Sequence, residues 1–101
     1  MEPPAKAYII AEVAVDDPQG FEAYRAAVAP LIAAFGGHYL VRGGAVHALE
    51  GEAPGARMVV IEFPSLAAAE TFWHSEEYRP VAALRHKTAQ SRIYMIEGMA
   101  A

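Results

Sequence analysis

The stretch that decides the fold is residues 57–65, Arg-Met-Val-Val-Ile-Glu-Phe-Pro-Ser. A short run rich in β-branched and aromatic residues stops at Pro64, which is typical of a strand that ends in a turn. Ser65 can then cap a helix, because its hydroxyl can accept from the free N–H groups of the first turn. The apolar stripe of this helix is Leu66, Ala69, Phe72 and Trp73. The sequence therefore predicts a strand that runs directly into a helix.

The same unit occurs near the beginning of the chain. Residues 7–15, Ala-Tyr-Ile-Ile-Ala-Glu-Val-Ala-Val, predict a strand, after which Asp17 can cap a helix and Pro18 suits its first position. The apolar stripe of this helix is Phe21, Tyr24, Val28, Leu31, Ile32 and Phe35. Pro30 lies inside the stripe and predicts a kink, or a break near Ala26.

Two further strands complete the order. Residues 38–42 follow the Gly36-Gly37 pair, whose first glycine suits a left-handed helix cap, and residues 91–97 form the last strand. Gly43-Gly44 predicts a bulge or a close backbone contact, with an extended pattern resuming over 45–49. The order is βαββαβ, that of the ferredoxin-like α+β fold with an antiparallel sheet. The 101 residues leave room for this single domain, 1–101.

The bulk composition excludes several classes of protein. Eight Lys and Arg stand against twelve Asp and Glu, and no basic run could neutralise the phosphates of a nucleic acid. No apolar stretch approaches the ~20 residues that span a bilayer, and Met1 to Lys6 lack the pattern of a signal peptide. Cysteine is absent, and the four histidines have no metal-ligand spacing. We therefore expect a cytoplasmic protein that uses no metal and no cofactor.

One face of the predicted sheet has no helix to cover it. Side chains alternate between the two faces of a strand, and the apolar sets should face the helices. The other face then carries Tyr8, Ile10, Glu12, Met58, Val60 and Glu62. A surface this apolar predicts a homodimer through the open sheet face.

Two glutamates lie within this open face. We expect the first and third strands to be parallel neighbours, which places Glu12 and Glu62 at equivalent positions. Two nearby carboxylates in a partly apolar cavity cannot both ionise easily, so that one could act as a general acid or base near neutral pH. The alternative is that both bind arginine or backbone groups and fix the geometry of the dimer.

Several motifs together resemble the DUF1330 family over nearly the whole chain. They are Arg42-Gly43-Gly44, Glu50-Gly51, R-x-V-V-I-E-F-P-S over 57–65, W-H-S-E-E-Y over 73–78, and Glu97-Gly98. Position 74 is His, where the family more often has Tyr. The family resembles the dimeric α/β barrel superfamily, whose relatives include small isomerases, cofactor-free monooxygenases and haem-using enzymes. The resemblance implies a fold and a homodimer, and it names no reaction.

The glycine motif is a second candidate ligand site. Arg42 could hold a carboxylate or an enolate in a fork, while Gly43 and Gly44 let the backbone approach a ligand. The alternative is a bulge on an edge strand with Arg42 paired to a glutamate.

The region after the second helix supplies a third candidate. Trp73 and Tyr78 do not share a helix face, which predicts a break between them, and either could wall a pocket at the mouth of the barrel. Ser75 can cap a further helical turn, whose regularity Pro80 limits. The alternative is that Trp73 packs in the core.

Three isolated side chains complete the candidates. His38 begins the second strand and could act as a base near the cavity, and Tyr8 on the open face could contact a ligand. His74 could be a haem ligand only by analogy with the superfamily.

These candidates favour a homodimer that binds a small organic acid or an aromatic-like metabolite in a barrel cavity. Its chemistry would be cofactor-free proton transfer or isomerisation, with Glu12 or Glu62 as base and Arg42 as anion partner. A non-catalytic dimeric binding or interaction protein is the alternative. A monooxygenase-like or haem-using enzyme of the same superfamily is the second alternative, so whether the protein is an enzyme stays open.

Overall fold

The computed structural model describes residues 5–100 and contains one four-stranded sheet. Its strands are β1 (Ala7–Val15), β2 (His38–Arg42), β3 (Arg57–Phe63) and β4 (Ala89–Glu97). They lie in the order β2-β3-β1-β4, and all neighbouring pairs are antiparallel. This is the ferredoxin-like α+β arrangement that the element order predicts. Residues 1–4, on which the signal-peptide prediction partly rests, lie outside the described residues.

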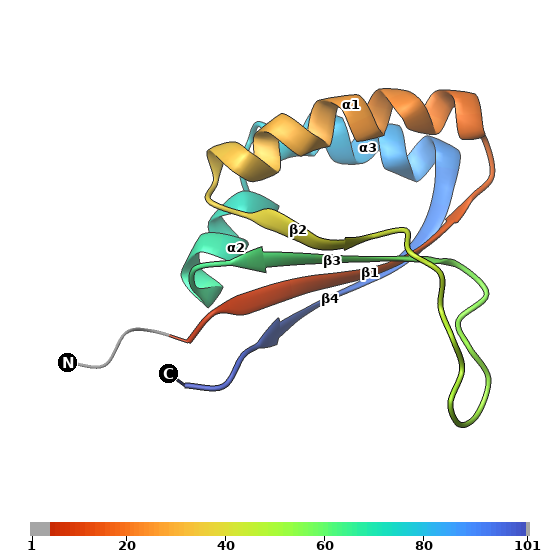
Figure 1. Ribbon diagram of the computed structural model, residues 1–101. Coiled ribbons are helices and arrows are strands. Elements are labelled where there is room, and N and C mark those ends of the chain that lie inside the picture. Colours follow the sequence, from red (N-terminus) through yellow and green to blue (C-terminus); the bar gives the residue numbers. More distant parts are fainter. Residues whose placement is uncertain (1–4, 101) are drawn as a thin grey trace.

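All three helices cover the same face of the sheet (Figure 1). They are α1 (Pro18–Ala34), α2 (Leu66–Trp73) and α3 (Tyr78–Thr88). The predicted caps form: the Asp17 carboxylate accepts from the Gly20 N–H at 3.1 Å, and the Ser65 hydroxyl accepts from the Ala68 N–H at 3.1 Å. No helix within residues 5–100 is both long enough and apolar enough to cross a membrane.

Helix α1 runs without interruption through Pro30, so the predicted break near Ala26 is wrong. Proline removes one hydrogen bond of the helix ladder. The buried side chains of Phe21, Val28 and Ile32 hold the helix to the rest of the molecule on both sides of that position. The apolar stripe therefore outweighs the lost bond.

Helix α3 is longer than the single turn that the sequence predicts. The Ser75 hydroxyl accepts from the Tyr78 N–H at 3.1 Å and donates to the Phe72 carbonyl at 2.8 Å, so it joins α2 to α3. Pro80 lies in the first turn of α3, where an N–H has no partner within the helix. Proline is therefore compatible with the helix there, and the predicted helix break between Trp73 and Tyr78 is confirmed.

The core lies between the helices and one face of the sheet. In β1 the buried residues alternate with half-buried ones, as the parity of the sequence predicts. The buried strand residues on the helix side are Ala7, Ile9, Ala11, Val13, Ile61 and Phe63. The opposite face of β1 and β3 has no helix over it in the described chain.

The expected parallel pairing of β1 and β3 is wrong. The two strands are antiparallel, with Tyr8 opposite Glu62 and Glu12 opposite Met58. In this topology β3 inserts between β1 and β2 and runs against both. Glu12 and Glu62 are therefore four register positions apart, which at ~3.3 Å per residue is ~13 Å. They share a face, but they do not form a carboxylate pair.

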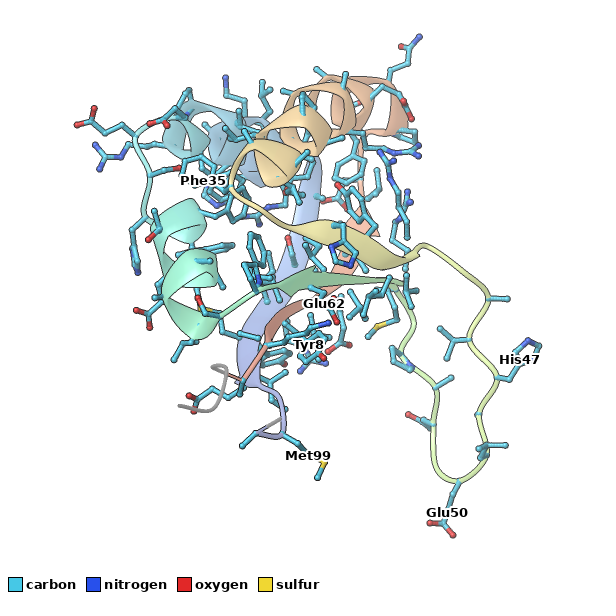
Figure 2. The ribbon with its side chains drawn as sticks, turned by 60° about the vertical axis from the view of Figure 1, so that its left-hand side comes forward. Tyr8, Phe35, His47, Glu50, Glu62 and Met99 are labelled. Carbon is cyan, nitrogen blue, oxygen red and sulfur yellow. The ribbon has the colours of Figure 1, made fainter. Side chains whose placement is uncertain are left out.

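Strand β2 contains its irregularity earlier than predicted. The register with β3 shifts between Tyr39 and Val41, so the extra residue is Leu40 and not a glycine of the Gly43-Gly44 pair. The close backbone contact does form, because the Gly43 N–H donates to the Met58 carbonyl at 2.7 Å. Residues 45–49 form no strand and belong to a loop that leaves the sheet, with His47 and Glu50 far from the helices (Figure 2).

Candidate functional site

A cavity lies between α1 and the helix-covered face of the sheet. Side chains from all seven elements line it, and most of its surface is apolar. Its principal apolar walls are Phe21, Val28, Ile61, Phe72, Trp73 and Ile93. The space that water centres can occupy is about 60 Å³, several times the ~10–15 Å³ that one water needs. The sequence predicts a cavity on the open face of the sheet, inside a barrel of two sheets, whereas this cavity lies on the helix-covered face.

Four of the six arginines in the sequence line this one cavity: Arg25, Arg42, Arg57 and Arg85. No Asp or Glu of residues 5–100 is part of its lining. The whole chain carries a formal charge of −4, so the cavity has the opposite sign to the protein around it. Low-dielectric walls strengthen the field of such a cluster.

Arg85 is the most buried of these arginines, with 6% of its surface exposed. Its Nη1 donates to the Ser91 hydroxyl at 2.9 Å, and its Nη2 lies 3.5 Å from the Tyr78 hydroxyl. Its Nε is buried without a hydrogen-bond partner in the described chain. No carboxylate among residues 5–100 lies within 4.0 Å of it. The guanidinium is therefore a buried cation with an unused donor.

Two tyrosine hydroxyls lie beside this guanidinium. The Tyr24 and Tyr78 hydroxyls are 3.1 Å apart, and the Arg85 guanidinium lies 5.8 Å from the centre of the Tyr24 ring. Burial, with the neighbouring Tyr78, raises the pKa of Tyr24 well above its ordinary value of 10.0. Tyr24 is therefore a neutral hydroxyl at physiological pH. One hydroxyl of the pair donates to the other, which leaves the second proton for a ligand.

Three of the predicted ligand contacts line the cavity. They are Arg42, Trp73 and Tyr78, and the Trp73 and Tyr78 rings lie 5.4 Å apart. Ser75 positions Tyr78 through its hydrogen bond to that residue's N–H. Gly43 borders the Arg57 guanidinium, whereas no heavy atom lies within 4 Å of where a Gly44 Cβ would be.

Four other predicted residues lie on the open face, outside the cavity. Glu62 is 3.1 Å from Nε2 of His38 and 3.4 Å from Nζ of Lys6, and Tyr8 is its register neighbour. Figure 2 shows Tyr8 and Glu62 on the side of the sheet away from α1. Glu12 lies 3.4 Å from the Arg92 guanidinium. Glu12 thus has an arginine neighbour, as the alternative interpretation expected, whereas the neighbours of Glu62 are a lysine and a histidine.

The remaining histidine candidate, His74, lies at the surface. His74 is the exposed cap residue at the end of α2. Within the described chain, no three His, Asp or Glu side chains gather in a way that could hold a metal ion.

Sequence reasoning missed the residues that give the cavity its chemistry, namely Arg25, Tyr24, Tyr39, Arg57 and Arg85. A signal for Arg85 was present, because it follows Tyr78 by seven residues and Ala82 by three, which is one helix face. All three are buried on α3. Tyr24 was identified only as part of an apolar stripe, since nothing local to α1 shows that its hydroxyl meets another.

The fold and the cavity define a ferredoxin-like α+β domain with an apolar, arginine-lined cavity beneath its helices. The sequence matches the family model of DUF1330, a domain of unknown function, over residues 6–99. The chain therefore belongs to the DUF1330 family. No curated protein matches it.

Solved structures share this fold at low sequence identity. A protein of unknown function from Rhodopseudomonas palustris has a TM-score of 0.76 at 17% identity, covering 99% of this chain and 87% of that one. SnoaB, a cofactor-independent oxygenase from Streptomyces nogalater, has a TM-score of 0.69 at 14% identity and covers 96% of both chains. A putative antibiotic biosynthesis monooxygenase from Bacteroides thetaiotaomicron has a TM-score of 0.55 at 16% identity, with coverage of 94% and 89%. At these identities the likeness establishes the fold alone.

Proposed function

We propose that the protein binds a small organic acid in the cavity beneath α1, with Arg85 as the partner of its carboxylate. The observation that carries this proposal is the buried Arg85 guanidinium, which has an unused Nε and no carboxylate neighbour within residues 5–100. A buried charge without a counter-charge is strongly unfavourable. A bound carboxylate would supply both the missing charge and an acceptor for Nε.

The rest of the cavity suits the body of such a ligand. The second proton of the Tyr24 and Tyr78 hydroxyl pair can reach an acceptor on the ligand, because both tyrosines adjoin Arg85. The apolar walls, which include Phe72 and Trp73, would contact an apolar or aromatic ring. A few polar groups at one point of an apolar cavity are typical of small-molecule sites.

The test compares phenylacetate with phenylacetamide, which has the same shape and no charge. Titration of 15N-labelled protein should give chemical-shift changes in α3 and α1 with phenylacetate, and at least tenfold weaker binding with the amide. The variant Arg85→Met should remove this preference for the acid. Equal binding of the two probes to the wild-type protein would contradict the proposal.

The open sheet face supports a second, structural proposal, that of a homodimer. This face carries half-buried Ile10 and Val60 at its centre and the exposed side chains of Tyr94 and Ile96, 50% and 52% exposed, at its β4 edge. Contiguous apolar surface of this kind is typical of an interface. In such a dimer Glu12 and Glu62 would be enclosed between the two sheets, and any catalytic role for them would belong there and not to the cavity.

The variant Ile10→Glu tests the dimer, because it places a carboxylate at the centre of the open face. Ala33→Glu on the exposed side of α1 is the matched control. Light scattering at micromolar concentration should give a dimer for the wild-type and control proteins and a monomer for Ile10→Glu. A monomeric wild-type protein would overturn this part. The cytoplasmic location stays a prediction, which cell fractionation tests.

A further inference from the structure

The three arginines other than Arg85 form a separate cationic group in the cavity, which we call the mouth cluster: Arg25, Arg42 and Arg57. Arg42 lies on β2, one edge of the sheet, whereas Arg85 is hydrogen-bonded to Ser91 on β4, the opposite edge. Adjacent strands are ~4.8 Å apart, so the edge strands are separated by ~14 Å. The cavity therefore has cationic groups approaching it from two sides.

The bulge at Leu40 is what turns Arg42 into the cavity. Without it, Tyr39 and Arg42 would lie on opposite faces, because their separation of three residues is odd. The extra residue restores a common face, with Tyr39 opposite Ile61 and Arg42 opposite Val59. The Arg42 guanidinium then lies 4.6 Å from the centre of the Tyr39 ring. Re-aiming a side chain is a recognised effect of bulges.

Gly43 makes room for the second member of the mouth cluster. Its φ is +75°, and a Cβ at this position would be 2.6 Å from Nη2 of Arg57. Any other residue would therefore strain the backbone and displace the guanidinium. The Arg42-Gly43 dipeptide of the family motif thus supplies one arginine of the cavity and leaves room for a second, Arg57 on the neighbouring strand β3.

All three arginines of the mouth cluster line the same cavity as Tyr39. Burial raises the pKa of Tyr39, while Arg42, Arg25 and Arg57 act to lower it and Tyr78 acts to raise it. Of these three arginines, only Arg25 has a carboxylate neighbour within 4.0 Å in residues 5–100, the exposed Glu22 at 3.0 Å. Like charges gathered in this way repel one another, and an anion between them relieves the repulsion.

We infer that the ligand is a two-ended organic acid, with one acidic group at Arg85, a second at the mouth cluster and an apolar or aromatic body between them. This inference rests on the proposed function, because it takes the Arg85 site as given and adds a second anion site to it. The apolar residues between the two cationic groups, among them Val59 and Ile61, contact the body of the ligand. A ligand with one charge would leave one group of arginines without a counter-ion.

The experiment uses four probes of one shape. They are 4-(carboxymethyl)benzoate, its two half-amides, in each of which one carboxylate becomes a carboxamide, and the diamide. Calorimetric titration should show the dianion binding at least tenfold tighter than either half-amide, and each half-amide binding tighter than the diamide. Arg42→Gln should reduce the advantage of the dianion over its half-amides to less than threefold. The matched control is Arg92→Gln, which removes the same charge from the open face and should leave this advantage unchanged.

The outcomes separate the two proposals. If each half-amide binds as tightly as the dianion, and both bind tighter than the diamide, the second anion site is wrong and the Arg85 site stands. If no acid binds tighter than the diamide, the proposed function itself fails. If Arg92→Gln reduces the advantage as much as Arg42→Gln does, the effect belongs to net charge and the mouth cluster is not a site.

Discussion

Replacing Arg85 with methionine tests whether this buried guanidinium is present for binding or for stability. Methionine keeps most of the length and apolar volume of the side chain and removes its charge. The variant loses the 2.9 Å hydrogen bond to Ser91 and the longer contact with Tyr78, and it also removes the buried Nε that has no partner in the described chain. The first change destabilises the fold, and the second stabilises it.

The balance of these terms can be estimated. The hydrogen bond to Ser91 has a charged donor, and such bonds contribute ~1.5–3 kcal/mol net. A buried charge without a counter-charge destabilises a fold by ~3–5 kcal/mol, so that replacing it with an apolar side chain of similar volume recovers energy of that order. We therefore expect Arg85→Met to be more stable than the wild type by ~1 kcal/mol, which raises the Tm of a domain of this size by about 4–8 °C. Under the proposed function, Arg85→Met also removes two charged hydrogen bonds to the carboxylate of the ligand. At ~1.5 kcal/mol each, their loss should weaken the binding of an organic acid about 100-fold.

Thermal unfolding measures the change in Tm, and titration with phenylacetate at the same protein concentration measures the change in affinity. The matched control is Arg79→Met, which makes the same change on α3 at an exposed position outside the cavity. It should alter neither Tm nor binding by a measurable amount. If Arg85→Met lowers Tm by several degrees, then Arg85 is a structural tie between α3 and β4, and the argument from its unused donor is refuted.

Three further changes probe the cavity and the fold that supports it. Burial raises the pKa of Tyr24, so that above pH ~10 the unfolded chain releases this proton and the folded chain does not, and the free energy of unfolding should fall by up to ~1.4 kcal/mol per pH unit. Urea unfolding at pH 9 to 11 should show a smaller fall for Tyr24→Phe, which lacks this hydroxyl. Equal dependence of the free energy of unfolding on pH in the two proteins would disprove this. Gly43→Ala should cost about 1 kcal/mol for its φ of +75° and weaken binding of the dianion severalfold by displacing Arg57, whereas Gly44→Ala should do neither. Asp17→Ala should lower the free energy of unfolding by ~1 kcal/mol through loss of the cap on α1 without changing acid affinity, and an unchanged Tm would show that the cap contributes nothing.

The strands and helix starts were predictable because local chemistry decides them. The β-branched run at 57–63 and the caps at Asp17 and Ser65 give their structures almost independently of the rest of the chain. Strand pairing is different, because it depends on residues far apart in the sequence. The expected parallel pairing of the strands that carry Glu12 and Glu62 is wrong, because the crossover topology makes these strands antiparallel.

The cavity was less predictable because its polar residues come from separate elements. Tyr24 lies on α1, Tyr39 on β2 and Arg85 on α3, and only the packing of the three elements brings them together. Arg42 shows most clearly why the sequence could not predict the cavity. The sequence marks it as an anion partner, but the face to which it points depends on whether a bulge precedes it, and Leu40 carries no local sign of one.

The distribution of charge favours a ligand that is recognised at short range. The chain has eight Lys and Arg and twelve Asp and Glu, and four of the arginines line the cavity. The rest of the molecule therefore holds 8 − 4 = 4 cationic groups and 12 acidic groups, a formal charge of −8 around a cavity whose lining carries four positive charges. At a distance an organic acid meets repulsion, which falls off within a Debye length of ~8 Å at physiological salt. Only inside the cavity, where apolar walls strengthen the field of the arginines, does attraction dominate. Such an arrangement would give little help to the rate of encounter. Under the proposed function the arginines would act through the stability of the bound complex, and a molecule of the right shape but without acidic groups would gain nothing from them.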